Sequence, residues 1–241
     1  MNDILLSFIL GLVQGLTEFL PISSSAHLLL PTLIFGSNDL GLYFDISVHA
    51  GTLIAVVYYF RNEIFLMSKS LLENNNLNED KNLIIQLIVA TIPIVILGFI
   101  FKDLISQRIF SINDIAISNL IFASILLFAF LNNKGKKTLI NITILGACFI
   151  GLFQCFALIP GASRSGAAIT AGLLIGLSLK DASKFAFLLA IPTILGALTL
   201  LIFDLNFLTP FGISTNSTLC PLSTDFQIIV SPMSIFATLI E

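Results

Sequence analysis

GLVQGLTEFLPISSS, residues 11–25, recurs in altered form as GLFQCFALIPGASRS, residues 151–165. With a gap of one residue, both read Gly-Leu-x-Gln, an apolar run, a proline and then Ser-x-Ser. A weaker similarity follows each stretch, where Gly51 and Gly196 begin further apolar helices. This pattern predicts two structural repeats. We expect them to be inverted, with broken helices around a polar site near the middle of a membrane, although the alignment itself gives no orientation.

The composition is that of a membrane protein. Of the 241 residues, 56% are hydrophobic and 10% are charged, and the mean hydropathy is +1.02. Soluble domains carry about 25% charged residues, so this chain has too few to cover a surface that faces water. Its main solvent must be lipid. The net charge of −3 is small and dispersed, which excludes nucleic acid as a partner.

Continuous apolar blocks predict an all-α polytopic membrane protein. They are residues 4–20, 28–35, 42–60, 83–101, 115–131, 139–160, 167–179 and 185–207. A spanning helix needs about 20 residues, and the blocks 28–35 and 167–179 are too short. Each of these two follows a Ser-rich turn, so we expect re-entrant or broken helices whose irregular backbone is buried in protein or lines a cavity.

Charged loops and the end of the chain define the domain organisation. The mixed-charge segment 61–81 and the basic segment 134–137 are separated by two expected spans, so they share a side, which the positive-inside tendency makes cytoplasmic.

We expect one membrane domain, residues 1–208, with repeat 1 at about 4–101 and repeat 2 at about 139–208. Residues 209–241 are polar at first and then broken by Ser231-Pro232. We expect an atypical, truncated tail without two long spanning helices.

Few ionisable residues lie inside or beside the apolar blocks. They include Glu18, Asp45, Arg164, His27 and His49. A charge at membrane depth costs about 2.5–3.5 kcal/mol on insertion scales, so each is a candidate functional residue. Glu18 and Arg164 are the strongest candidates.

The surroundings of Glu18 suit a divalent cation. Gln14 precedes it by four residues, so on a helix the two side chains point the same way and can offer oxygens to one Mg²⁺ or Ca²⁺ ion. His27 follows Ser24 by three residues and could take a proton from its hydroxyl or from water. The alternative is a Glu18 that only hydrogen-bonds within the helix bundle.

The surroundings of Arg164 suit a phosphate. Residues 160–166, PGASRSG, predict a turn that opens a helix near Ala167. Backbone N–H groups at the helix start, including that of Gly166, converge there with two hydroxyls, from Ser163 and Ser165, and a guanidinium. The alternative is an arginine that reaches to the membrane interface. Together the two stretches predict hydrolysis or transport of a phosphorylated lipid.

Residues 14–27, QGLTEFLPISSSAH, and residues 160–166 closely resemble the two motifs of the undecaprenyl-diphosphate phosphatase family, also called the bacitracin-resistance family. The resemblance continues through residues 44–53, FDISVHAGTL, and 185–192, FAFLLAIP, and covers about residues 3–208. It implies a multi-pass enzyme of the bacterial inner membrane that uses a divalent cation to remove the terminal phosphate of undecaprenyl diphosphate. Such an enzyme recycles the carrier lipid of cell-wall synthesis and confers resistance to bacitracin.

The resemblance also assigns roles to individual residues. The implied catalytic residues are Glu18, Ser24, His27 and Arg164; the phosphate-binding residues are Ser163, Arg164, Ser165 and Gly166; and the cation ligands are Glu18 and Gln14. We favour Ser24 as the nucleophile, with His27 as general base, over a water activated by His27. One departure is Ala168, which stands where family members usually carry Thr.

A second function is compatible with the same features. Repeats with broken helices are also typical of transporters, so a transporter or flippase for a polyprenyl phosphate is the alternative. The sequence leaves open whether copies of the chain form a homo-oligomer and toward which side of the membrane the site opens.

Overall fold

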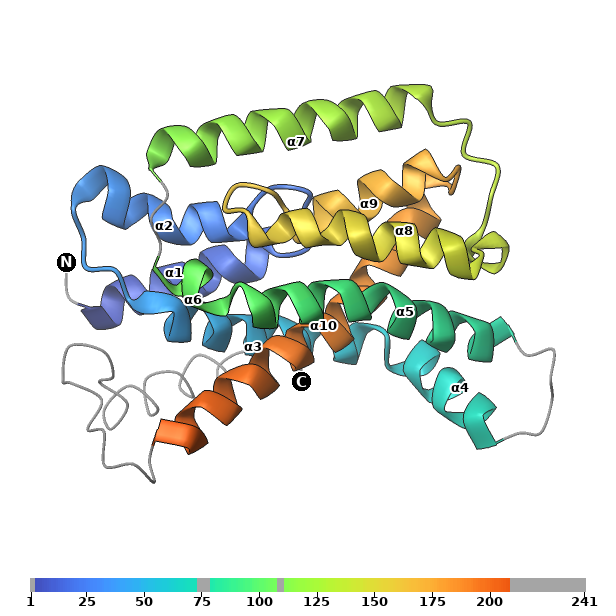
Figure 1. Ribbon diagram of the computed structural model, residues 1–241, viewed down its shortest axis with the longest axis horizontal. Coiled ribbons are helices and arrows are strands. Elements are labelled where there is room, and N and C mark those ends of the chain that lie inside the picture. Colours follow the sequence, from blue (N-terminus) through green and yellow to red (C-terminus); the bar gives the residue numbers. More distant parts are fainter. Residues whose placement is uncertain (1–2, 73–78, 108–110, 209–241) are drawn as a thin grey trace.

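The computed structural model describes residues 3–72, 79–107 and 111–208 of the protein (Figure 1). Within these ranges the regular structure is helical apart from one isolated bridge between Lys137 and Leu177. The tail predicted at residues 209–241 lies outside the described residues. The helices are α1 (Asp3–Thr17), α2 (Ser24–Phe35), α3 (Gly41–Tyr59), α4 (Arg61–Leu72), α5 (Glu79–Ile100), α6 (Lys102–Ser106), α7 (Ile112–Asn132), η1 (Leu139–Asn141), α8 (Ile144–Gln154), η2 (Cys155–Leu158), α9 (Arg164–Leu174) and α10 (Leu179–Leu208).

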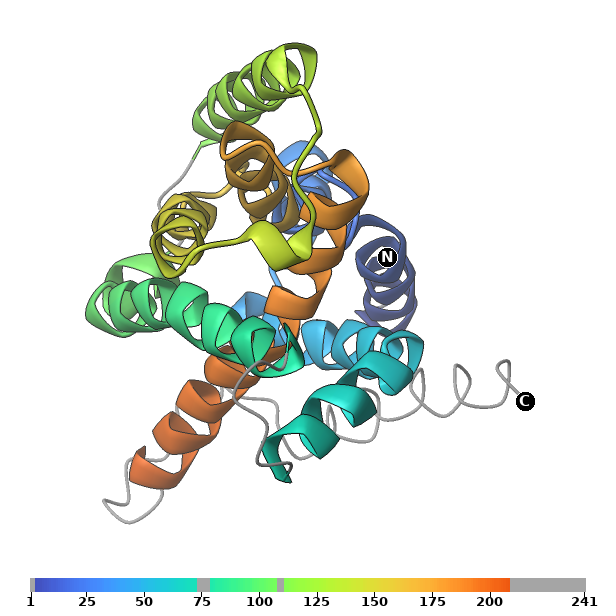
Figure 2. The same cartoon turned by 90° about the vertical axis from the view of Figure 1, so that its right-hand side faces the viewer.

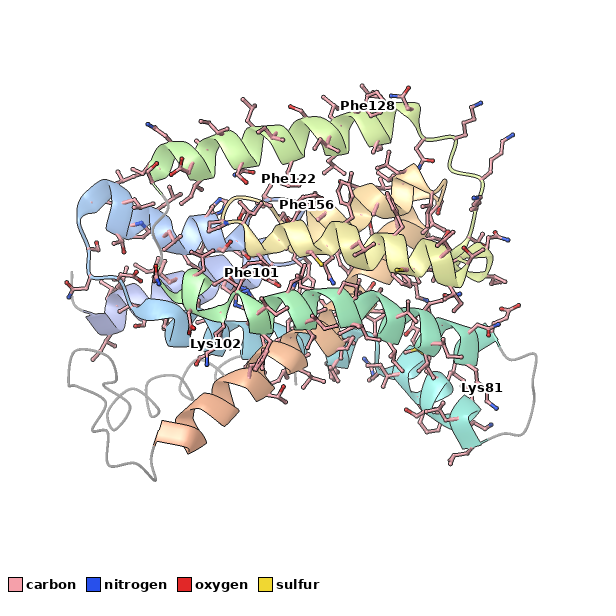
Figure 3. The ribbon with its side chains drawn as sticks, in the orientation of Figure 1. Lys81, Phe101, Lys102, Phe122, Phe128 and Phe156 are labelled. Carbon is pink, nitrogen blue, oxygen red and sulfur yellow. The ribbon has the colours of Figure 1, made fainter. Side chains whose placement is uncertain are left out.

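Three described helices are long and apolar enough to cross a membrane. They are α5, α7 and residues Leu179–Leu200 of α10. Large apolar side chains project outward from α7 (Figure 3), among them Leu120, Phe128 and Leu131, which are 71%, 62% and 71% exposed. Such an apolar surface is unfavourable in water and favourable in lipid. The structure therefore confirms the helical membrane class.

Two helical hairpins enter the molecule from opposite ends (Figure 1). Helices α1 and α2 reach inward from the end at which α3 begins, and helices α8 and α9 reach inward from the end at which α5 begins. The short helices expected at 28–35 and 167–179 are confirmed: α2 has 12 residues and α9 has 11, and each leads back toward the end from which its hairpin entered. The two turns touch, since Ser165 Oγ donates to the carbonyl oxygen of Leu20 at 2.8 Å.

Helix α9 forms the centre of the bundle. Nine of its 11 residues are buried, and it packs against α7, α8 and α10. The turn before it contains Gly161 at φ +98°, where a Cβ atom would lie 2.5 Å from the carbonyl oxygen of Ile115 in α7. Only glycine combines this left-handed backbone with so close an approach. Helix α9 is thus surrounded by protein, as expected for a re-entrant or broken helix.

Two segments differ from the prediction. The apolar block 139–160 is not one helix but η1, α8 and η2 in succession. Residues 61–72, expected as part of a charged loop, form α4, because Met67 and Ser70 pack into the bundle and Glu63 pairs with Lys184 of α10 at 3.0 Å. The hydrogen bond from Lys184 lowers the pKa of Glu63.

Described parts of the two charged segments, 61–81 and 134–137, lie at one end of the molecule. The start of α5, which carries Lys81, lies at the same end as the segment 133–138 that follows α7 (Figures 1 and 3). The view from that end also shows η1 there (Figure 2). Since α9 returns to this end, α10 begins there too, together with Lys180 and Lys184. The expectation that segments 61–81 and 134–137 share a side agrees with this arrangement.

Candidate active site

The carboxylate of Glu18 is the meeting point of four helices. It lies just after α1, and its side chain is 3% exposed. Its Oε2 atom accepts hydrogen bonds from Gln14 Nε2 of α1 at 2.6 Å and from Ser24 Oγ of α2 at 2.9 Å. His49 Nε2 of α3 lies 3.3 Å from Oε2, and Arg164 of α9 forms an ion pair with Oε1 through Nη2.

The ion pair between Glu18 and Arg164 joins the two hairpins. A carboxylate buried without compensation would be strongly unfavourable, and the guanidinium supplies the opposite charge. Arg164 is the first residue of α9, so the turn before that helix determines where its side chain begins. Because Ser24 and Arg164 contact the same carboxylate, their polar ends come together.

The serines of the turns hold the hairpins in place. Ser23 caps α2 by accepting a hydrogen bond from the Ala26 backbone N–H, and Ser163 caps α9 by accepting one from that of Gly166 at 3.1 Å. Ser165 donates to Leu20 and lies 3.1 Å from Ser163, oxygen to oxygen. Caps of this kind stabilise a helix start by about 1 kcal/mol. The hydroxyls of Ser163 and Ser165 thus hold the position of Arg164.

His27 is oriented by the backbone and not by Ser24. Its Nδ1 atom lies 2.6 Å from the carbonyl oxygen of Ser23. A carbonyl can only accept, so Nδ1 carries the proton and Nε2 is the nitrogen that can accept one. The hydroxyl of Ser24 donates to Glu18. The structure therefore directs the Ser24 proton to the carboxylate, whereas the sequence had suggested His27.

Two residues near the site had been given no specific role. His49, on α3, was a candidate functional residue because it is ionisable within an apolar block, but nothing in the sequence linked it to Glu18. Thr193, on α10, accepts a hydrogen bond from Arg164 Nη1 at 3.2 Å. The only sequence signal at Thr193 is a hydroxyl that follows Pro192 in an apolar helix, which is too common a pattern to indicate function.

The protein offers few ligands for a cation. Among the residues described, no three His, Cys, Asp or Glu side chains are grouped so as to hold a metal ion. Gln14 directs its amide nitrogen at Glu18, and its Oε1 atom is buried with no hydrogen-bond partner in the same ranges. An orphaned buried acceptor costs about 1–3 kcal/mol, and an amide that turned over would direct that oxygen toward Glu18. One carboxylate and one amide oxygen fit a cation that takes its other ligands from water and from a phosphate.

Comparison with known proteins identifies the family. The family profile described as bacitracin resistance protein BacA matches residues 7–239. The chain belongs to this family. The match reaches beyond residue 208, the limit suggested by the motifs alone.

Several relatives are similar over most of their length. An undecaprenyl-diphosphatase of Alcanivorax borkumensis is 46% identical over 194 residues, which are 79% of this chain and 73% of the relative. One of Teredinibacter turnerae is 47% identical over 195 residues, 80% of this chain and 74% of the relative. Undecaprenyl-diphosphatase 1 of Pseudoalteromonas translucida is 46% identical over 189 residues, 77% of this chain and 71% of the relative.

Proposed function

We propose that this protein hydrolyses undecaprenyl diphosphate to undecaprenyl phosphate and inorganic phosphate, and so recycles the cell-wall carrier lipid and confers bacitracin resistance. The observation that carries the proposal is the carboxylate of Glu18, which binds Ser24 and Arg164 in a chain of this family. A carboxylate, a hydroxyl and a guanidinium are the groups that phosphoryl transfer needs for activation and for charge stabilisation.

The setting of the proposed reaction is the bacterial inner membrane, with a multi-pass chain. We interpret the two hairpins as inverted repeats whose turns lie near the membrane midplane. Their opposite entry directions (Figure 1) and the contact between Ser165 and Leu20 support this interpretation. A site at that depth excludes bulk water, which strengthens each electrostatic interaction with the substrate.

Arg164 is the proposed phosphate clamp. Its planar guanidinium can donate two parallel hydrogen bonds to phosphate oxygens, and the start of α9 adds the positive end of the helix dipole. A diphosphate brings several anionic oxygens and competes with Glu18 for the guanidinium. Arg164 then stabilises the charge that develops on the transferred phosphoryl group.

Ser24 is the proposed nucleophile. Its oxygen attacks the terminal phosphorus, the bond from that phosphorus to the bridging oxygen breaks, and undecaprenyl phosphate leaves. The 2.9 Å hydrogen bond to Glu18 supports the carboxylate as first acceptor of the Ser24 proton. His27 is then the candidate base that activates the water which releases phosphate from the serine.

Glu18 and Gln14 are the proposed protein ligands of a divalent cation, Mg²⁺ or Ca²⁺. With so few protein oxygens, Glu18 and Gln14 would hold a cation that takes its other ligands from the diphosphate and from water, as is usual for Mg²⁺. When bound, it would neutralise part of the negative charge of the phosphates.

The test is phosphate release from undecaprenyl diphosphate by the purified protein in detergent. Release that requires added Mg²⁺ or Ca²⁺ is expected, and a chelator should stop it. In the Ser24→Ala variant release should fall to a few per cent or less, whereas Ser25→Ala, a matched change one residue away, should retain most of it. A transporter would release no phosphate from any variant, and full activity of Ser24→Ala would exclude the serine mechanism.

A further inference from the structure

The guanidinium of Arg164 is held on two sides. Nη2 contacts Glu18 in the turn after α1, and Nη1 donates to Thr193 Oγ1 on α10 at 3.2 Å. An anionic substrate would displace Glu18, because the Glu18 carboxylate occupies the side of the guanidinium to which the phosphate is proposed to bind. The second partner is a neutral hydroxyl on a different helix, so it can stay in place while a phosphate binds.

The hydroxyl of Thr193 is itself fixed in orientation. Its oxygen lies 2.9 Å from the carbonyl oxygen of Leu189 and 3.0 Å from that of Ala190, within its own helix. Its single proton is therefore directed to the helix backbone, a common arrangement for threonine in helices. The lone pairs of the oxygen are then the atoms that face Arg164, and the threonine serves as an acceptor of fixed direction.

The contact is largely shielded from solvent. Thr193 is 7% exposed, and α10 packs directly against α9. A hydrogen bond from a charged donor to a buried acceptor is stronger than one between neutral groups. Once a substrate has displaced Glu18, an Arg164 without the Thr193 acceptor would be free to rotate about its last side-chain bonds.

We propose that Thr193 is a positioning residue that fixes the plane of the Arg164 guanidinium, so that Nη2 faces the place where the diphosphate binds. This inference rests on the proposed phosphatase function. Helix α10 then contributes to the site through the Thr193 hydroxyl, which contacts Arg164 but neither Glu18 nor Ser24. A misoriented guanidinium would still attract a diphosphate by its charge but would stabilise the transition state poorly.

The test begins with two substitutions at position 193. Thr193→Val keeps the shape and removes the acceptor, and we expect kcat to fall about 10-fold or more with KM changed less than 3-fold. Thr193→Ser keeps the acceptor and should restore at least a third of wild-type kcat. Thr91→Val is the matched control, since the Thr91 hydroxyl also bonds its own helix, to Leu87 at 2.7 Å. It should leave kcat unchanged, and thermal unfolding of each variant verifies folding.

A double-mutant cycle then asks whether Thr193 acts through Arg164. Lysine has no second planar donor. In an Arg164→Lys background, the added Thr193→Val change should therefore lower kcat less than 3-fold. If steady-state turnover of Arg164→Lys is too low to measure, the same cycle is run on the rate of single-turnover phosphate release with the protein in excess over undecaprenyl diphosphate. Equal kcat of wild type and Thr193→Val, or an undiminished loss in the lysine background, would overturn the inference. A wild-type protein that releases no phosphate would instead contradict the proposed function.

Discussion

Glu18 is the residue on which the site depends. Its carboxylate is bound by side chains from both hairpins, and His49 of α3 lies beside it. The Arg164 guanidinium supplies the opposite charge, and Gln14 and Ser24 supply hydrogen bonds to the buried carboxylate. The cost of burying the charge is thereby offset by the groups that the proposed reaction uses.

Arg164→Lys tests the clamp at this scale. Lysine keeps the positive charge but lacks the planar fork that donates to two oxygens. We expect kcat/KM for undecaprenyl diphosphate to fall by 10²–10³, which corresponds to about 3–4 kcal/mol of lost transition-state stabilisation. Steady-state phosphate release by the wild type and by the variant measures this fall in kcat/KM. A lysine variant with near wild-type turnover would show that charge alone is sufficient.

Glu18→Gln tests the proposed cation ligand. The amide keeps the shape but loses the negative charge that a hard cation needs. We expect turnover to fall by at least 10-fold and half-maximal activity to require several times more Mg²⁺. The measurement is a Mg²⁺ titration of phosphate release by both proteins. If the two titration curves have the same midpoint, Glu18 does not hold the cation.

At the scale of elements, the close contact between α5 and α8 positions the second hairpin. Gly151 of α8 lies against the backbone of Ala90 in α5, so a Cβ atom at residue 151 would be 2.4 Å from the Ala90 carbonyl oxygen. Real Cβ atoms do not approach backbone so closely, and the two helices would have to separate. Gly11, which occupies the same place in the other Gly-Leu-x-Gln stretch, has nothing within 4 Å of such an atom.

Gly151→Ala and Gly11→Ala should therefore differ although they alter corresponding residues. We expect Gly151→Ala to lower the free energy of unfolding by about 1–3 kcal/mol because the helices are overpacked. Gly11→Ala should be neutral or slightly stabilising because alanine favours a helix over glycine. The measurement is thermal unfolding of both variants in the same detergent, which compares their stabilities. Equal stability of the two variants would contradict the close packing of α5 and α8.

At the scale of the whole molecule, the charged segments at one end predict an orientation in the membrane. The loop between α2 and α3, with Asn38, lies at the opposite end from the segment with Lys136 (Figure 1). The basic residues near Lys136 and Lys180 belong on the cytoplasmic side by the positive-inside tendency.

Cysteine labelling tests that orientation. In a variant whose own three cysteines are replaced by serine, Lys136→Cys and Lys180→Cys should react with an impermeant maleimide only after the cells are opened. Asn38→Cys should react in intact spheroplasts. Labelling of residues 136 and 180 from different sides would show that α8 and α9 do not form a hairpin that returns to its own end.

The sequence alone predicts the membrane class, the short helices and the two site motifs, because each of these is determined by residues that are close together in the chain. Composition determines the solvent of the chain, and run length separates spanning helices from the short α2 and α9. Two motifs were enough to indicate the family and to single out Glu18 and Arg164. The block 139–160 was predicted less well, because hydropathy does not distinguish a continuous helix from one interrupted by short 3-10 turns.

Only the tertiary structure decided which side chains meet. His49 and Thr193 join Glu18 and Arg164 because α3 and α10 pack beside the two turns, and no periodicity within one helix encodes a contact between helices. The direction of the Ser24 hydroxyl, toward Glu18 and not toward His27, also depends on where the hairpins stop. Chemical type is a property of a residue, whereas proximity at the site results from the packing of the whole bundle, and the structure is needed to see it.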